Sequence, residues 1–192
     1  MGTDLRLRAP RWEDFDDLRE NYYLCYEERE QGYPIGITLF EERPSYAAEV
    51  EWFSGFLHRV LREEVVAVVA EREGHVVGNC SVGPRGPGPG SEVAHVGDLG
   101  ILVHRDHRGS GVGSALLKEA IERCRGKFEV LTLDVFENNE GAKRLYRRFG
   151  FERCGRVPRA IRRRGTYFDE EKMVLILGPA GAGVSPGPLG AL

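Results

Sequence analysis

Residues 108–114 form the glycine-rich run RGSGVGS, which follows an apolar segment and precedes an amphipathic one. The first N–H groups of a helix have no intrahelical partner, and the helix dipole adds about half a positive charge there. Glycines remove the side chains that would keep an anion away from those N–H groups. Arg108 can add a full positive charge. The run therefore predicts a pyrophosphate site at the start of a helix.

The spacing of these glycines excludes two common phosphate-binding motifs. The dinucleotide fingerprint G-x-G-x-x-G would need a glycine at position 114, which is Ser114. The nucleotide-hydrolase loop G-x-x-x-x-G-K-[ST] does not occur in the chain. The pattern that remains is R-x-x-G-x-G, formed by Arg108, Gly111 and Gly113.

Hydrophobic periodicity predicts the elements that must position this loop. Strands are expected at residues 5–8, 65–70, 75–82, 93–103, 129–136, 151–157 and 166–177, and helices at 12–30, 46–62, 112–125 and 139–149. The loops are residues 31–44, the flexible GPRGPGPG segment at 83–90, and an arginine-rich loop at 156–164 between the last two strands. Gly97 indicates a bulge or a close backbone approach within its strand. The order predicts a single mixed α/β domain over residues 1–177, followed by a flexible Gly/Pro-rich tail at 178–192.

Composition narrows the class of protein. The chain has 192 residues, 41% of them hydrophobic, and a formal net charge of −3, so neither nucleic acid nor a membrane is an expected partner. The first residues lack the apolar core of a secretory signal. The four cysteines are widely separated and have no C-x-x-C spacing, so we expect neither a metal site nor a redox pair. These features are typical of a cytoplasmic protein with reduced, mostly buried thiols.

A second motif makes the pattern specific. Residues 139–151 fit N-x-x-A-x-x-L-Y-x-x-x-G-F, about 30 residues after the glycine run, and VHRDH at 103–107 leads into that run. Together these segments resemble the GNAT superfamily of N-acetyltransferases over roughly residues 65–177. The resemblance implies an α/β GNAT fold, with a mixed central sheet of about seven strands flanked by about four helices. It also implies acetyl-CoA as co-substrate, without a metal.

The resemblance further implies roles for individual residues. The fourth and fifth strands of the fold splay apart, so that Ile101, Leu102 and Val103 would pair through their backbone with the pantetheine arm. Asn139 would hydrogen-bond that arm, and Tyr146 would lie near the thioester sulfur. The expected pyrophosphate site comprises Arg108, Gly109, Ser110, Gly111, Val112, Gly113 and Ser114.

The implied reaction is direct transfer of acetyl to a primary amine in a ternary complex. An amine is mostly ammonium at pH 7 and must lose a proton before it attacks. Asp98 is a candidate proton acceptor, His95 is another, and a chain of water molecules without a dedicated base is a third. A backbone N–H of the splayed strand would stabilise the oxyanion. Tyr146 would then protonate the departing thiolate.

The acceptor stays open at this point. Carboxylates in and before the loop 31–44 would suit a cationic amine, whereas the arginines of 156–164 would suit an anion; either set could instead face solvent. A small amine or amino acid, a protein N-terminus and a lysine are all compatible with the chain, and so is a homodimer. The alternative function is a non-catalytic acyl-CoA-binding or regulatory module on the same fold.

Overall fold

A computed structural model describes residues 5–33, 36–87 and 90–178. The helices are α1 (Phe15–Glu30), α2 (Tyr46–Leu61), α3 (Val112–Cys124) and α4 (Glu140–Arg148), with short 3-10 turns at Trp12–Asp14 and Arg105–His107. The strands are β1 (Arg6–Arg8), β2 (Val66–Arg72), β3 (His75–Pro84), β4 (Val96–Val103), β5 (Val130–Phe136), β6 (Glu152–Arg163) and β7 (Thr166–Ile176). The expected tail lies outside the described residues, apart from Gly178.

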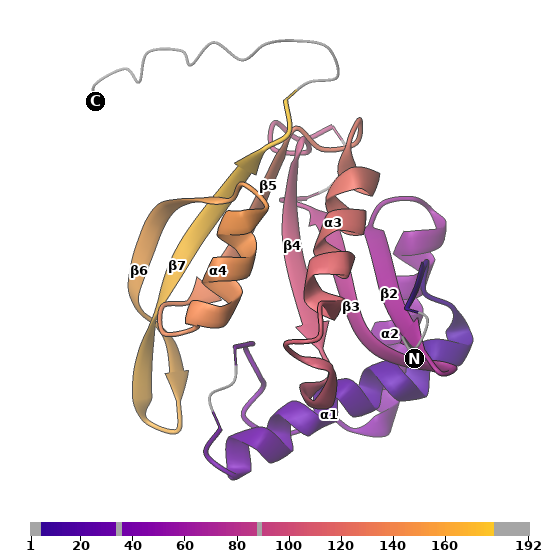
Figure 1. Ribbon diagram of the computed structural model, residues 1–192, viewed down its shortest axis with the longest axis vertical. Coiled ribbons are helices and arrows are strands. Elements are labelled where there is room, and N and C mark those ends of the chain that lie inside the picture. The colour runs from indigo at the N-terminus through magenta and orange to yellow at the C-terminus, as the bar shows by residue number, and fades with distance from the viewer. Residues whose placement is uncertain (1–4, 34–35, 88–89, 179–192) are drawn as a thin grey trace.

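All seven strands join one mixed sheet in the order β1-β2-β3-β4-β5-β7-β6. β4 and β5 are parallel, whereas every other neighbouring pair is antiparallel. Helices α3 and α4 lie over one face of the sheet (Figure 1), and α1 and α2 pack on the other. The seven-stranded sheet and the four helices confirm the expected fold class.

The apolar stripe of α3 builds the main core. Its side chains Val112, Leu116, Leu117, Ala120 and Cys124 are fully buried. They pack on the inward residues of β2 and β3, including Val68 and Cys80, and on Leu131 of β5. Burial of about 1.5–3 kcal/mol per large apolar side chain fixes α3, and therefore the glycine loop at its start, against the sheet.

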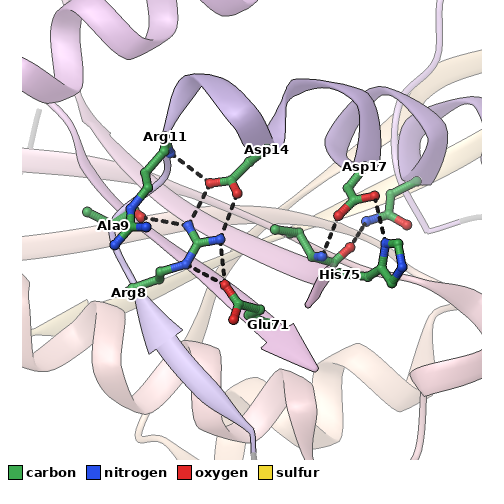
Figure 2. A network of polar contacts seen from close by, with 9 residues as sticks. Arg8, Ala9, Arg11, Asp14, Asp17, Glu71 and His75 are labelled. Atoms are coloured by element: carbon green, nitrogen blue, oxygen red, sulfur yellow. Dashed lines mark hydrogen bonds and ion pairs between the residues drawn. The ribbon is translucent and has the colours of Figure 1, made fainter. Parts of the chain in front are cut away.

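A polar network ties the N-terminal elements to the sheet (Figure 2). The guanidinium of Arg8 in β1 donates to both carboxylate oxygens of Asp14 at 2.7 Å and to Glu71 of β2 at 2.7 Å. Asp17 of α1 accepts from the backbone N–H of Val76 at 2.7 Å. Asp14 is 5% exposed, so loss of its arginine partner would leave a buried, uncompensated charge and destabilise the fold. The network sets where α1 begins relative to the sheet.

Two predictions about β4 require correction. The strand begins at Val96 instead of residue 93, because Val93 and His95 belong to a turn closed by the hydrogen bond from Val96 N to Val93 O. Gly97 forms no bulge, since its pairing with Pro84 and Leu131 is in regular register. A side chain at Gly97 would collide with Val82, so the close approach involves a neighbouring side chain and not a backbone.

The arginine-rich segment is also different from the prediction. Residues 156–163 extend β6, and only Arg164-Gly165, both with positive φ, form the turn of a long hairpin. Bulges near Arg153 and Val157 interrupt its register with β7. Glu73 and Gly74 form a tight turn between β2 and β3, again with positive φ at both residues.

Within the described ranges, no helix is long and apolar enough to cross a membrane. In the same ranges, no group of three or more His, Cys, Asp or Glu side chains is placed to hold a metal ion. Cys25, Cys80 and Cys124 are buried free thiols, and Cys154 is exposed.

Candidate active site

The splayed edge of β4 is the centre of the candidate site. β4 pairs with β5 only from Val96 to Asp98, whereas on its other side it pairs with β3 along its whole length to Val103. β5 continues to Phe136 but pairs there with β7. The β5-facing edge of residues 101–103 is therefore open along the described sheet. This is the edge at which the resemblance implies that Ile101, Leu102 and Val103 pair with the pantetheine arm.

The glycine loop enters α3 through two left-handed residues. Gly109 has φ +74°, and Gly111, the N-cap of α3, has φ +89°. No heavy atom lies within 4 Å of a Cβ placed on either residue, so their surroundings are open. Ser110 Oγ donates to the carbonyl of His107 at 2.7 Å and shapes the turn. The free N–H groups at the start of α3 thus face accessible space.

Arg108 does not add a free charge to this loop. Its Nη1 and Nη2 donate to the two carboxylate oxygens of Glu28 at 2.6 and 2.9 Å, and its Nε donates to the carbonyl of Val103 at 3.1 Å. The Glu28 carboxylate raises the pKa of Arg108. Arg108 therefore links α1, the end of β4 and the loop.

Arg148 is a cation that sequence analysis did not single out. Its Nη2 donates to Ser114 Oγ in the first turn of α3 at 2.9 Å, and the residue is exposed. It extends from the basic face of α4, which a helical pattern alone assigns to solvent. Only the packing of α4 beside α3 brings this charge to the start of α3.

Asn139 begins α4, and its Oδ1 accepts from the backbone N–H of Ala142 at 3.1 Å. Its Nδ2 faces Gly36 of the loop before α2, where a Cβ would collide with the amide. α4 is anchored to β7 by the buried pair of Lys143 and Glu171, whose Nζ and Oε1 lie 3.2 Å apart. Asn139 therefore serves as a helix cap and keeps its amide N–H groups toward the loop.

Tyr146 lies on the core side of α4 and is 7% exposed. Its ring is 5.9 Å from that of Phe151. Burial raises the pKa of its phenol well above the ordinary value, so the group stays protonated at neutral pH. Tyr146 lines a cavity of about 470 Å³ together with Asp98 and Ile101. The structure thus brings together the two catalytic candidates and one predicted pantetheine contact.

The two candidate bases lie at different places along β4. Asp98 faces the Tyr146 cavity, and its carboxylate accepts a hydrogen bond from Thr132 Oγ1 of β5. His95 is exposed in the turn before β4 and does not line the Tyr146 cavity. The geometry favours Asp98 over His95.

A second cavity of about 470 Å³ lies on the opposite face of the sheet, under α1 and α2. Gly100 and Ile101 of β4 line both cavities, so the two meet at the splayed strand. The second lining is mostly aromatic and aliphatic, but it also contains Glu49, which is 7% exposed. Sequence analysis did not single out Glu49. The missed signal is that Glu49 shares a helix face with Phe53, one turn further on.

Most arginines of residues 156–164 form ion pairs, a hydrogen bond or an aromatic contact within the chain. Arg156 pairs with Glu137 at 3.0 Å and with Asp169, and Arg164 pairs with Glu30. Arg159 stacks on Tyr167, with its guanidinium carbon 4.0 Å from the ring centroid. Arg163 Nη2 donates to the carbonyl of Ile37 at 2.8 Å. The hairpin thereby holds the loop before α2.

Comparison with known proteins agrees with this geometry. The family model described as "Acetyltransferase (GNAT) family" matches residues 3–151. An L-amino acid N-acetyltransferase of Escherichia coli is 33% identical over 60% of this chain and 70% of its own length. An L-methionine sulfoximine/L-methionine sulfone acetyltransferase of Pseudomonas aeruginosa is 32% identical over 76% of this chain and 84% of its own.

Solved structures share the fold. A ribosomal-protein-alanine N-acetyltransferase from Brucella melitensis superposes with a TM-score of 0.77 at 31% identity, over 90% of this chain and 99% of that one. A phosphinothricin acetyltransferase from Sinorhizobium meliloti, solved in complex with acetyl-CoA, has a TM-score of 0.77 at 24% identity, over 96% of this chain and 95% of that one. The second likeness shows the fold alone.

Proposed function

Because this chain belongs to the GNAT acetyltransferase family and is an acetyl-CoA-dependent N-acetyltransferase, we propose that it acetylates the primary amine of a small molecule of the amino-acid type. One observation carries the proposal: two cavities meet at Gly100 and Ile101 of the splayed strand. One cavity contains Tyr146, and the other is lined mainly by apolar side chains. A thioester on one side and an amine on the other would meet at β4.

The cofactor side uses the open edge and the glycine loop. Residues 101–103 pair with the pantetheine arm, and Asn139 contacts the same arm. The pyrophosphate lies on the N–H groups of residues 109–114, and Arg148 adds a positive charge near Ser114. Arg108 keeps the loop in place through Glu28. Acetyl-CoA supplies the acetyl group in a reactive thioester.

The chemical steps follow from Tyr146 and Asp98. Asp98 takes a proton from the ammonium through water, and the nitrogen lone pair then forms a bond to the thioester carbon. A backbone N–H of β4 stabilises the oxyanion. The carbon–sulfur bond breaks, and the thiolate receives the phenolic proton of Tyr146, whose raised pKa keeps the phenol protonated until this step. The amide nitrogen returns a proton to the phenolate, so the net products are the acetamide, CoA and one proton.

Two further observations support a small acceptor. The apolar cavity is bounded by Ile37, Phe40 and Pro44 of the loop before α2, and Arg163 holds that loop through Ile37. A cavity of this volume suits a small molecule. Relatives at 32–33% identity act on L-amino acids or on methionine sulfoximine and sulfone, which supports the same class here.

Release of free CoA from acetyl-CoA tests the proposal. We expect turnover with L-amino acids that carry an apolar side chain, and much lower turnover with a peptide that begins with alanine. Equal or greater activity on the peptide would indicate that the acceptor is a protein N-terminus and not a small molecule. No CoA release with either class, from a protein whose melting temperature rises with acetyl-CoA, would favour a binding module.

A further inference from the structure

The cavity under α1 and α2 is an apolar pocket with one buried carboxylate. Aromatic rings supply much of its wall, and β3 and β4 supply its floor. The rings are Phe15, Tyr22, Phe40, Trp52, Phe53 and Phe56. Glu49 lies among them on α2. A carboxylate in such surroundings loses hydration, and its ionised form must be compensated by a partner.

Glu49 has no such partner within the described chain. Its side chain makes no hydrogen bond and no ion pair with any described residue, although 93% of the residue is removed from solvent. The N-cap hydrogen bond of α2 is made by Ser45, whose Oγ accepts from Ala48 N at 3.2 Å, so capping does not occupy Glu49. An ionised Glu49 therefore has unused acceptor capacity inside the pocket.

The charged and titratable groups around the pocket do not satisfy Glu49. Arg19 of α1 lies near enough to oppose the rise in the Glu49 pKa, but its guanidinium pairs with Asp16 at 3.2 Å and lies 5.0 Å from the Tyr46 ring centroid. Tyr22 of α1 directs its hydroxyl to Tyr26 at 3.2 Å. Cys80 of β3 is a buried thiol.

We propose that Glu49 binds the ammonium group of the acceptor, in a pocket whose aromatic wall holds the acceptor's apolar body. The occupant is thus the ammonium group of the proposed amino-acid-type acceptor together with its apolar side chain. This inference rests on the proposed function, because it assigns the apolar cavity to the acceptor. A charge-assisted hydrogen bond to ammonium satisfies the carboxylate, and nearby aromatic faces add cation–π attraction.

The position of Glu49 is consistent with this role. Gly100, Ile101 and Leu102 of β4 line the same pocket, so an amine held by Glu49 lies in the compartment that reaches the splayed strand. Gly100 has no heavy atom within 4 Å of a Cβ position, which leaves room for a ligand beside the β4 backbone. Glu49 thus selects and orients the amine, whereas Asp98 and Tyr146 handle protons.

Calorimetric titration of the protein with CoA bound tests the site without turnover. The probes are 2-phenylethylamine and its neutral isostere 2-phenylethanol, each measured on the wild type, on Glu49→Gln and on Glu51→Gln. Glu51 is an exposed carboxylate on the same helix and serves as the matched control. We expect the wild type to bind the amine at least tenfold more tightly than the alcohol. Glu49→Gln should lose that preference, and Glu51→Gln should keep it.

Three outcomes would overturn the proposal: no amine binding by the wild type, equal binding of amine and alcohol, or an unchanged preference in Glu49→Gln. CoA release assayed on the same proteins separates this inference from the proposed function. Amine binding that depends on Glu49, without any turnover, would refute the transferase reaction but retain the ammonium site. Turnover by Glu49→Gln with an unchanged KM for the amine would support the transferase reaction but refute the ammonium site.

Discussion

Arg108 and Glu28 form a bidentate ion pair that links the glycine loop to α1, with nitrogen–oxygen distances of 2.6 and 2.9 Å. The Glu28 side chain is 6% exposed, whereas that of Arg108 is 43% exposed. The buried carboxylate therefore depends on this arginine for its compensation. The arginine of the R-x-x-G-x-G pattern positions the loop in this chain and is already neutralised before a phosphate arrives.

Replacement of Arg108 by alanine should reduce both stability and cofactor affinity. The change leaves the Glu28 carboxylate buried without its partner, which costs about 2 kcal/mol after allowance for the exposure of the pair. In a domain of this size that corresponds to roughly 4–8 °C in melting temperature. The KM for acetyl-CoA should rise about tenfold. Thermal unfolding and steady-state kinetics measure the two effects.

The double variant Arg108→Ala/Glu28→Gln provides the control. Removal of the orphaned charge should restore much of the lost stability, while the KM for acetyl-CoA stays high because the loop is no longer tied to α1. If Arg108→Ala keeps its full melting temperature, the ion pair does not stabilise the loop.

Gly111→Ala should weaken acetyl-CoA binding beyond its effect on stability. Gly111 has φ +89°, a conformation that costs an L-residue about 1–2 kcal/mol, and its Cβ would enter the space beside the free N–H groups of α3. Gly126→Ala is the matched control, since Gly126 has φ +78° and equally open surroundings after the other end of α3. Both variants should melt several degrees lower, but only Gly111→Ala should raise the KM for acetyl-CoA. Equal KM values in both would place the pyrophosphate elsewhere.

Much of the fold could be predicted from sequence because its elements have strong local signals. The amphipathic pattern after the glycine run predicted α3, and hydrophobic periodicity predicted helices at 46–62 and 139–149, where the structure has α2 and α4. Boundaries were wrong where tertiary pairing decides. β6 continues through the arginines because β7 supplies its partner, which the polar composition of residues 156–164 does not reveal.

The candidate site was predictable only in part, for a similar reason. A local motif can show that a helix start binds anions, but it cannot show that Glu28, 80 residues earlier, occupies Arg108. Arg148 and Glu49 belong to the candidate site because of the elements that pack beside them. From residue type alone, Arg148 is assigned to a solvated helix face and Glu49 to the start of a helix.

Tyr146→Phe should lower kcat about 100-fold and leave the KM for acetyl-CoA unchanged, because the phenol is used only when the thiolate departs. The ring and its contact with Phe151 are kept, so the variant should fold normally. Tyr167→Phe on the exposed hairpin is the control and should behave as the wild type. An unchanged kcat in Tyr146→Phe would leave thiolate protonation to water.

Asp98→Asn should lower kcat by about 100-fold if this carboxylate accepts the ammonium proton. The amide can still receive the hydrogen bond from Thr132 Oγ1, which limits structural effects. His95→Gln should change kcat by less than twofold, because His95 lies before β4 and away from the Tyr146 cavity. If kcat falls in His95→Gln and not in Asp98→Asn, the proton acceptor is His95 and not Asp98.

Glu49→Gln should make the protein more stable and a poorer enzyme at the same time. Burial raises the pKa of Glu49 above its ordinary 4.5, so the folded state holds this proton more tightly than the unfolded state. The wild type consequently loses stability as pH rises from about 4.5 through the folded-state pKa. The gain in melting temperature of Glu49→Gln over the wild type should be near zero at pH 4 and largest at pH 8.

The activity of Glu49→Gln should depend on pH in the opposite direction. Only ionised Glu49 attracts ammonium, so the wild-type kcat/KM for the amine should rise through the same pKa, while that of Glu49→Gln lacks this rise and is at least tenfold lower at pH 8. Glu51→Gln should follow the wild type in both measurements. If Glu49→Gln is less stable than the wild type at pH 8, Glu49 has a structural partner. If kcat/KM of Glu49→Gln for the amine still rises with pH as in the wild type, the amine binds elsewhere.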